Sequence, residues 1–178
     1  MHGASWWHPL QLIPAGTPRC AALVVTAFFF GALGTRSSAP NLCFACLELA
    51  RTRQHAEMII GQWQAHDLID VARRCVQYDN WFLLAYSTGL ALLVLAAAER
   101  LPPASMLAQL GPPIAWAQWL AAACDRVENA GLTAMLAGQT QGRWPFVTFC
   151  FAATKFALIL VGLAYLILFL VALAVPSR

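Results

Sequence analysis

Charged side chains are scarce in this sequence. Only 11% of the residues are Asp, Glu, Lys or Arg, whereas 60% are hydrophobic. A soluble domain has about 25% charged and about 45–50% apolar residues. Long apolar runs with so few charges to cover a surface are typical of chains that face lipid. The composition argues against a water-soluble enzyme and predicts an integral membrane protein.

Patterns of catalysis and nucleic-acid binding are also missing. The net charge of +3 is too small for nucleic-acid binding, and no basic stripe interleaved with aromatic residues occurs. There is no glycine-rich phosphate loop, serine nucleophile motif or HExxH zinc motif. His66 and Asp70 stand four residues apart, but no third ligand accompanies them at a known spacing. We expect no metal and no cofactor, and nothing points directly to an enzyme.

Four apolar stretches separated by polar loops predict an all-α integral membrane protein, a single domain of four transmembrane helices over residues 1–178. Pro102 and Pro103 end the second stretch, and Pro112 and Pro113 open the third. The approximate spans are 20–36, 76–98, 114–137 and 145–175.

The first stretch has two interpretations. Between Arg19 and Arg36 it covers only about 24 Å of helix, short of the ~30 Å hydrocarbon core, so it crosses only if both arginines reach the headgroups. The alternative is a secretory signal peptide with a small-residue cleavage site at Ser37-Ser38-Ala39. We favour a retained helix, because the charged region of such a signal would be long and carry only Arg19.

The polar region from 43 to 74 predicts an amphipathic surface helical segment between the first two transmembrane helices. Because its two apolar stripes are in shifted registers, we expect a bend near Gly61. A helical hairpin packed on the bundle is the alternative. The stripes are Ala56, Ile59, Ile60 and Trp63, then Ala65, Leu68, Ile69, Ala72 and Val76.

Basic residues are unequally divided between the two sides of the predicted bundle. Cytoplasmic loops of membrane proteins carry the excess of arginine and lysine. We therefore expect a multi-pass protein of the bacterial inner membrane, with the first loop in the cytoplasm and both termini outside. The larger group is Arg36, Arg51, Arg53, Arg73, Arg74 and Arg143, and the smaller is Arg19, Arg100 and Arg178.

Ionisable and polar residues interrupt the predicted membrane helices. An ionised group inside a bilayer costs several kcal/mol unless it is paired, so such residues face the bundle interior. At 1.5 Å per residue, four of them lie roughly 13–18 Å from the same membrane face: Tyr86, Asp125, Glu128 and Lys155. The whole predicted polar cluster is Asp79, Tyr86, Asp125, Arg126, Glu128, Asn129 and Lys155.

The spacing of the third stretch assigns these side chains to different helix faces. Asp125, Glu128 and Asn129 stand at i, i+3 and i+4 and share one face. Arg126 points about 100° away, and Asp79 is its candidate partner. Two acids and two bases would make the core of the cluster neutral. Such a cluster either fixes how the helices pack or forms a proton relay or substrate site.

Cys43 and Cys46 have the spacing of a redox pair. This pair beside a membrane helix is similar to the membrane thiol oxidases of the vitamin K epoxide reductase type, which are also small helical bundles. However, the predicted side is cytoplasmic, where disulfides are rare. No second cysteine pair follows in a later external loop.

Several short motifs, taken in order, resemble a family of small bacterial integral membrane proteins with no established activity. The resemblance covers roughly residues 48–165 and implies four membrane helices, but it implies no function. Arg126 departs from the family pattern, in which a neutral residue is expected at that position. The motifs are Glu48-Leu49-Ala50, Glu57, Trp63, Asp79-x-x-Phe82-x-x-x-Tyr86, Asp125-x-x-Glu128-Asn129-x-x-Leu132 and Lys155-Phe156.

Three hypotheses about function follow. We favour a non-catalytic membrane protein, an accessory subunit or a small ligand- or partner-binding protein, because short loops leave little room for a soluble active site. It would work in the lipid bilayer, within a larger membrane complex or as a homo-oligomer, and its polar cluster would organise the bundle. The second is a small transporter or proton-linked protein using Asp125, Glu128 and Lys155. The third is a membrane thiol redox protein using Cys43 and Cys46.

Overall fold

The structure, a computed structural model, describes residues 7–37 and 42–174. Within these ranges the chain is all-helical and has no strand, which confirms the predicted all-α class. A short 3-10 helix precedes six α-helices. The elements are η1 (Pro9–Leu12), α1 (Thr17–Ser37), α2 (Phe44–Glu48), α3 (Arg53–Ala65), α4 (Ile69–Ala98), α5 (Met106–Leu136) and α6 (Trp144–Ala174).

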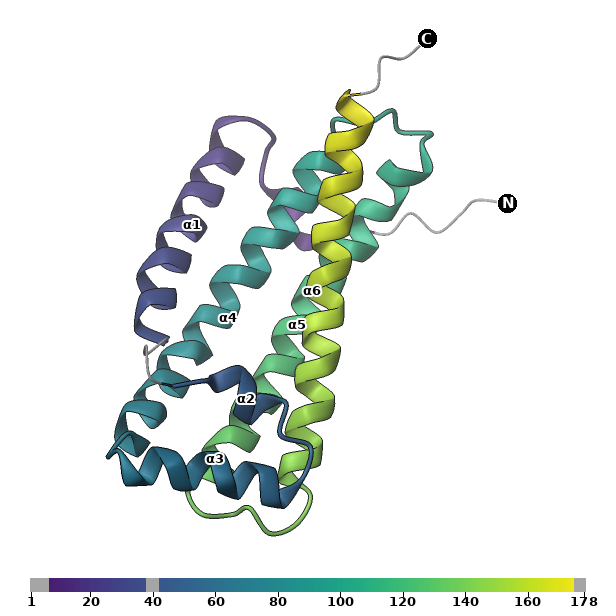
Figure 1. The fold of residues 1–178 in the computed structure, drawn as a ribbon. Helices are drawn as coiled ribbons and strands as arrows, with labels where there is room; N and C mark the ends of the chain where they lie inside the picture. The colour runs from purple at the N-terminus through teal and green to yellow at the C-terminus, as the bar shows by residue number, and fades with distance from the viewer. Residues whose placement is uncertain (1–6, 38–41, 175–178) are drawn as a thin grey trace.

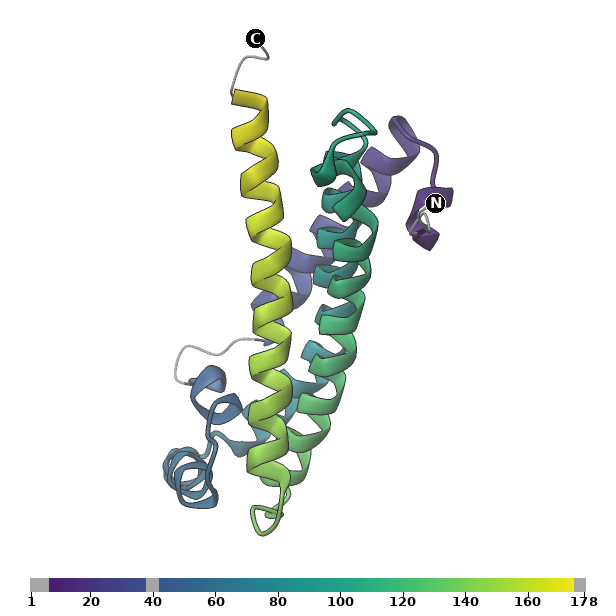
Figure 2. The same cartoon turned by 90° about the vertical axis from the view of Figure 1, so that its right-hand side faces the viewer.

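The long helices form a bundle, and the short ones gather at one of its ends. α4 packs against α5, α5 against α6, and α1 against the outer side of α4. α3 lies across the end where α5 and α6 are connected, and α2 sits above it (Figure 1). The α4–α5 connection and η1 lie toward the other end, as does the C-terminal end of α6 (Figures 1 and 2). In this arrangement α2 contacts both α5 and α6.

Among the described residues, two helices are long and apolar enough to cross a membrane: α4 and α6. They differ in how they are packed. The apolar stretch of α4 is largely buried by its neighbours, whereas that of α6 is mostly exposed. Exposed side chains of α6 include Leu160, Ile167 and Leu170. An outward apolar face of this kind needs lipid or another protein to cover it.

Two helices begin earlier than the apolar stretches that predicted them, and the predicted helix opening at Pro112-Pro113 is wrong. α4 begins at Ile69 rather than 76, so the second apolar stripe belongs largely to it and not to the surface segment. α5 begins at Met106 rather than 114, because the Ser105 hydroxyl accepts the Ala108 N–H and caps the helix there. Pro112 and Pro113 therefore lie inside α5 instead of opening it.

The predicted stripe on α3 is confirmed, and the predicted bend is not. Ala56, Ile59, Ile60 and Trp63 are all buried and belong to the core shared with Leu132, Met135 and Leu136 of α5. α3 runs without a break through the predicted bend at 61. The chain turns instead after α3, where Asp67 adopts a φ of 53°. A left-handed residue of this kind ends a helix and starts a new register, and Asp adopts it more readily than most residues.

Glu57 ties α3 to the α5–α6 loop. Its Oε1 accepts hydrogen bonds from Arg53 Nε and from Thr140 Oγ1, each 2.7 Å long. The Arg53 hydrogen bond, followed by that of Thr140, lowers the pKa of Glu57. The ionised carboxylate is therefore the form that holds α3 in place.

We predict that α3 loosens in acid. A group whose pKa is lowered in the folded state stabilises it above its ordinary pKa, and this contribution is lost as the pH falls through the lowered value. Amide hydrogen exchange of α3, corrected for the intrinsic rate, should rise relative to that of α5 below about pH 4. Glu57→Gln should show the faster exchange already at neutral pH. This role is contradicted if the amides of α3 exchange equally slowly in the wild-type protein and in Glu57→Gln, at neutral pH and in acid alike.

Candidate functional site

Lys155, the only lysine of the sequence, lies at the centre of a buried group of carboxylates. It projects from α6, and its Nζ is 2.7 Å from Glu128 Oε2 and 3.1 Å from Asp125 Oδ1, both on α5. The same Nζ is 3.7 Å from Glu48 Oε2 on α2. Side-chain exposure is 8% for Lys155, 3% for Asp125 and 1% for Glu128. One ammonium group thus connects three helices away from solvent.

The shared face of α5 explains how the site extends to α4. Asp125 and Glu128 reach α6, while Asn129 donates a hydrogen bond of 2.8 Å to Asp79 Oδ2 on α4. The Tyr86 hydroxyl, also on α4, is buried near the Asp125 carboxyl group. We call Glu48, Asp79, Asp125, Glu128 and Lys155 the Lys155 cluster.

α5 and α6 pack closely on both sides of the cluster. Gly131 of α5 faces Thr148 of α6, and Gly162 of α6 faces Gln118 of α5. At both positions any larger residue would clash with the opposite side chain. Small residues at such crossings let two helices approach closely. Because Lys155 lies between these two crossings, its side chain is held against the α5 carboxylates.

Arg126 is not part of the cluster. Its side chain is exposed on the outside of α5, and its guanidinium donates a hydrogen bond of 3.0 Å to Asn80 Oδ1. The predicted partner, Asp79, is the preceding residue on α4 but faces Asn129 instead. The prediction of a charge-neutral cluster with two acids and two bases is therefore wrong.

Glu48 joins the site unexpectedly, because its position in the sequence assigns it to the polar surface segment. It ends α2, a helix of five residues that is anchored by the fully buried Leu47 and the adjacent Ala50. Burial raises the pKa of Glu48, and Lys155 opposes that shift in part. The only sequence signal for Glu48 was its place in the first motif of the resemblance.

The cluster has more acid than base. It contains four carboxyl groups, and Lys155, the one basic side chain there among the described residues, forms ion pairs with three of them. Lys155 Nζ lies 2.7 Å from Glu128 Oε2, whereas Glu128 Oε1 is buried with no hydrogen-bond partner among the described residues. One ammonium group can balance the charge of one carboxylate, and a buried carboxylate without a counter-charge is costly. An excess of buried carboxyl groups over bases therefore favours proton binding.

Cys43 and Cys46 are joined by a disulfide at the start of α2, with their Cα atoms 5.2 Å apart. Both residues are exposed. The disulfide lies on the same short helix as Glu48, so the redox pair and the Lys155 cluster are neighbours. Elsewhere in the described chain Cys75 and Cys124 are buried free thiols.

The described residues thus define a helical bundle built around an acidic cluster with a single lysine. Within them no group of three or more His, Cys, Asp or Glu side chains is arranged to hold a metal ion. No family model, curated protein sequence or solved structure matches the chain. The function must therefore be argued from the bundle and its cluster.

Removing the lysine should be costly. We predict that Lys155→Met lowers the stability by about 3–5 kcal/mol, because breaking a buried ion pair leaves uncompensated charge. Thermal unfolding in mild detergent measures the loss. Adding Glu128→Gln to Lys155→Met should restore part of it, since the double variant buries one carboxylate fewer. If Lys155→Met unfolds at the wild-type temperature, the lysine does not hold the cluster together.

Proposed function

We propose that the chain is an integral membrane protein in which α1, α4, α5 and α6 cross the bilayer and α3 lies on its surface. The four helices have 21, 30, 31 and 31 residues. At 1.5 Å per residue, even the shortest spans about 31 Å, close to the thickness of the hydrocarbon core. The exposed apolar face of α6 and the few charges along the bundle support this arrangement.

The orientation proposed from the arginines agrees with how the loops are grouped. The segment between α1 and α4 and the α5–α6 loop lie at one end of the bundle (Figure 1). This end has the larger share of arginines, which favours the cytoplasmic side. We propose that both termini lie outside, in a bacterial inner membrane such as the resemblance implies.

We infer that the protein is a non-catalytic binding protein whose Lys155 cluster takes up protons and organises the bundle. The observation that supports this most directly is the convergence of three carboxyl groups on one buried lysine, with a fourth, Asp79, bound to the neighbouring Asn129. In a medium of low dielectric constant, carboxylates without a counter-charge bind protons instead of remaining ionised. The cluster therefore stores protons that can exchange when its surroundings change.

The position of Glu48 gives proton uptake a mechanical consequence. Glu48 is the link between the cluster and α2, which packs in turn on α3. Protonation of Glu48 would weaken its attraction to Lys155 and loosen α2. A partner subunit or a second copy that contacts α2 and α3 would then sense the protonation state. This places the protein among accessory subunits of membrane complexes.

Infrared spectroscopy tests proton storage directly. We predict a band of protonated carboxyl groups at neutral pH, and this band should shift in heavy water. Glu128→Gln or Glu48→Gln should reduce it. Asp70→Asn is the matched control, because that side chain is 81% exposed at the start of α4 and should leave the band unchanged. If the wild-type protein lacks the band, the cluster holds no protons and the proposal fails.

The same variants separate storage from transport. In proteoliposomes with a trapped pH indicator, a storage site should leave a pH gradient intact. Dissipation of the gradient by the wild-type protein, but not by Glu128→Gln, would instead establish proton-linked transport.

The disulfide favours a second candidate function, that of a membrane thiol redox protein. A substrate dithiol would reduce Cys43–Cys46, transferring two electrons and two protons to form two thiols, and an acceptor of the quinone class would reoxidise them. We predict that mild reduction followed by a maleimide reagent labels two more thiols in the wild-type protein than in Cys43→Ser/Cys46→Ser. If both cysteines are labelled without reduction in native membranes, the disulfide is absent there and this function fails.

A further inference from the structure

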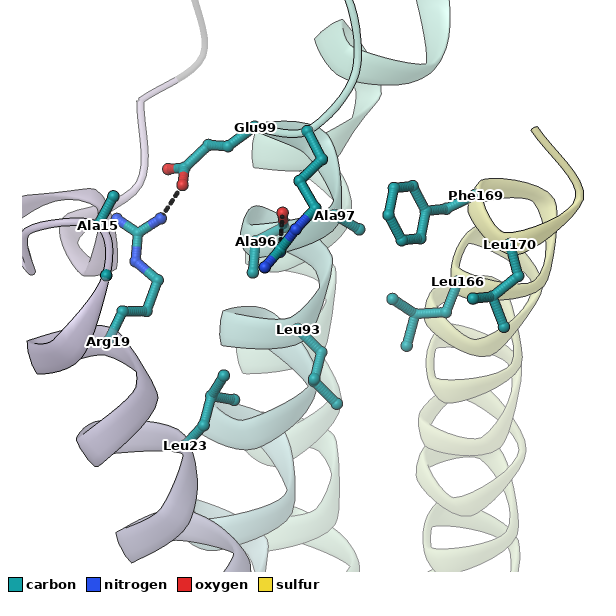
Figure 3. Close-up of a pocket in the computed structure, with 12 residues that line it drawn as sticks. Ala15, Arg19, Leu23, Leu93, Ala96, Ala97, Glu99, Leu166, Phe169 and Leu170 are labelled. Atoms are coloured by element: carbon teal, nitrogen blue, oxygen red, sulfur yellow. Dashed lines mark hydrogen bonds and ion pairs between the residues drawn. The ribbon is translucent and has the colours of Figure 1, made fainter. Parts of the chain in front are cut away.

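A cavity of about 650 Å³ lies between α1 and α6, with α4 forming its floor (Figure 3). Its walls are apolar: Leu23 projects from α1, Leu93 from α4, and Leu166 and Leu170 from α6. Phe169 closes the α6 side near the top of the view. The volume falls within the about 300–1,000 Å³ typical of small-molecule sites. The cavity is distinct from the Lys155 cluster, because none of the cluster residues lines it.

The rim of the cavity is polar and positively charged. Arg19 from α1 forms an ion pair with Glu99, and Arg100 extends from the end of α4. Two arginines and one glutamate leave one positive charge at the rim. The rim lies where α1 begins and α4 ends, at the level where a membrane-spanning bundle meets the lipid headgroups.

The hydrogen bonding of Arg19 is incomplete. Its residue exposure is only 5%, and one guanidinium nitrogen donates to the Ile13 carbonyl at 2.7 Å while another pairs with Glu99. Its Nε is buried, and none of the described residues supplies an acceptor to it. Buried guanidinium donors are normally satisfied, so an orphaned one lining a cavity indicates an acceptor that completes the site.

Arg100 is free to bind the same acceptor. Among the described residues, its side chain makes one hydrogen bond, of 2.9 Å, from a guanidinium nitrogen to the carbonyl of Ala96 in α4. The residue is exposed at the mouth of the cavity. Arginine pairs are well suited to bind phosphate oxygens, because each presents several donors in a planar fork.

We propose that this cavity binds an anionic phospholipid. An acyl chain would lie between α1 and α6 along the leucine walls, and the phosphate group would accept hydrogen bonds from Arg19 and Arg100. The apolar wall requires a hydrocarbon chain and the net positive rim requires an anion, so neither free phosphate nor a neutral lipid satisfies both. The inference rests on the proposed insertion of the bundle in a bilayer.

The test uses the full chain in lipid nanodiscs with phosphatidylglycerol whose acyl chain carries a photoactivatable group. We expect cross-links to map to α1 and α6 around Leu23 and Leu166. The phosphatidylcholine analogue should label about five-fold less, the ratio expected for one positive charge near a lipid surface. Equal labelling by the two lipids, or labelling spread evenly around the bundle, overturns the site.

Variants separate the head group from the acyl chain. Arg100→Gln should lower the preference for phosphatidylglycerol to near unity and leave the fold intact, because within the described ranges the Arg100 side chain donates only to the Ala96 carbonyl. Ala96→Phe, which fills the cavity and keeps its rim charges, should reduce labelling by both lipids. Arg143→Gln is the matched control, since that exposed arginine lies at the opposite end of the bundle. Loss of preference in the control would show a surface charge effect and overturn the site.

Two further outcomes separate this inference from the proposed membrane insertion. If alkaline carbonate releases the chain from membranes, the insertion and the lipid site both fail. If the chain stays in the membrane and the phosphatidylglycerol and phosphatidylcholine probes label it equally, only the lipid site fails. A cross-link between two copies of the chain through the cavity would show that a second protomer fills it, and this also overturns the lipid.

Discussion

The structure depends on one ammonium group that forms ion pairs with three carboxyl groups. Lys155 connects α2, α5 and α6, and Asn129 carries the connection on to Asp79 of α4. Apolar contacts alone would leave α6 free to slide and rotate, because most of its residues are apolar and many equivalent packings exist. A single buried charge with fixed partners has only one satisfactory position, so it selects one register for the helix. The glycine crossings at Gly131 and Gly162 then fix the spacing.

We propose that the same group makes the bundle sensitive to protons. A cluster with equal numbers of acids and bases would only hold the helices together. With four acids and one base, the net charge depends on how many protons are bound. Glu48 is the member best placed to report a change, because it belongs to the shortest α-helix and its side chain is more exposed than those of Lys155, Asp125 and Glu128. The disulfide at the other end of α2 restricts how far that helix can unfold when Glu48 is released.

Helix geometry explains what the sequence could predict about this site. Asp125, Glu128 and Lys155 stand at similar depths because α5 and α6 are joined by a short loop and rise equally per residue. Arg126 was misassigned because Asp79 and Asn80 are adjacent, and a rotation of about 100° decides which of them it meets. Glu48 was missed because five helical residues carry no periodic signal. Where α4 begins depends on the backbone at Asp67, which apolar stripes do not encode.

The two ends of the bundle carry an excess of charge of opposite sign. In the Lys155 cluster the acids outnumber the bases, and protons from water can make up the difference. At the start of α1 the excess is basic, and a guanidinium cannot give up its charge because arginine stays protonated in proteins. We propose that a separate anion supplies the missing partner there. An anion that also fills a leucine-lined cavity is an amphiphile, and a bilayer supplies it in quantity. A bound lipid would then connect α1 to α6 and complete the packing of α1, which otherwise packs on α4.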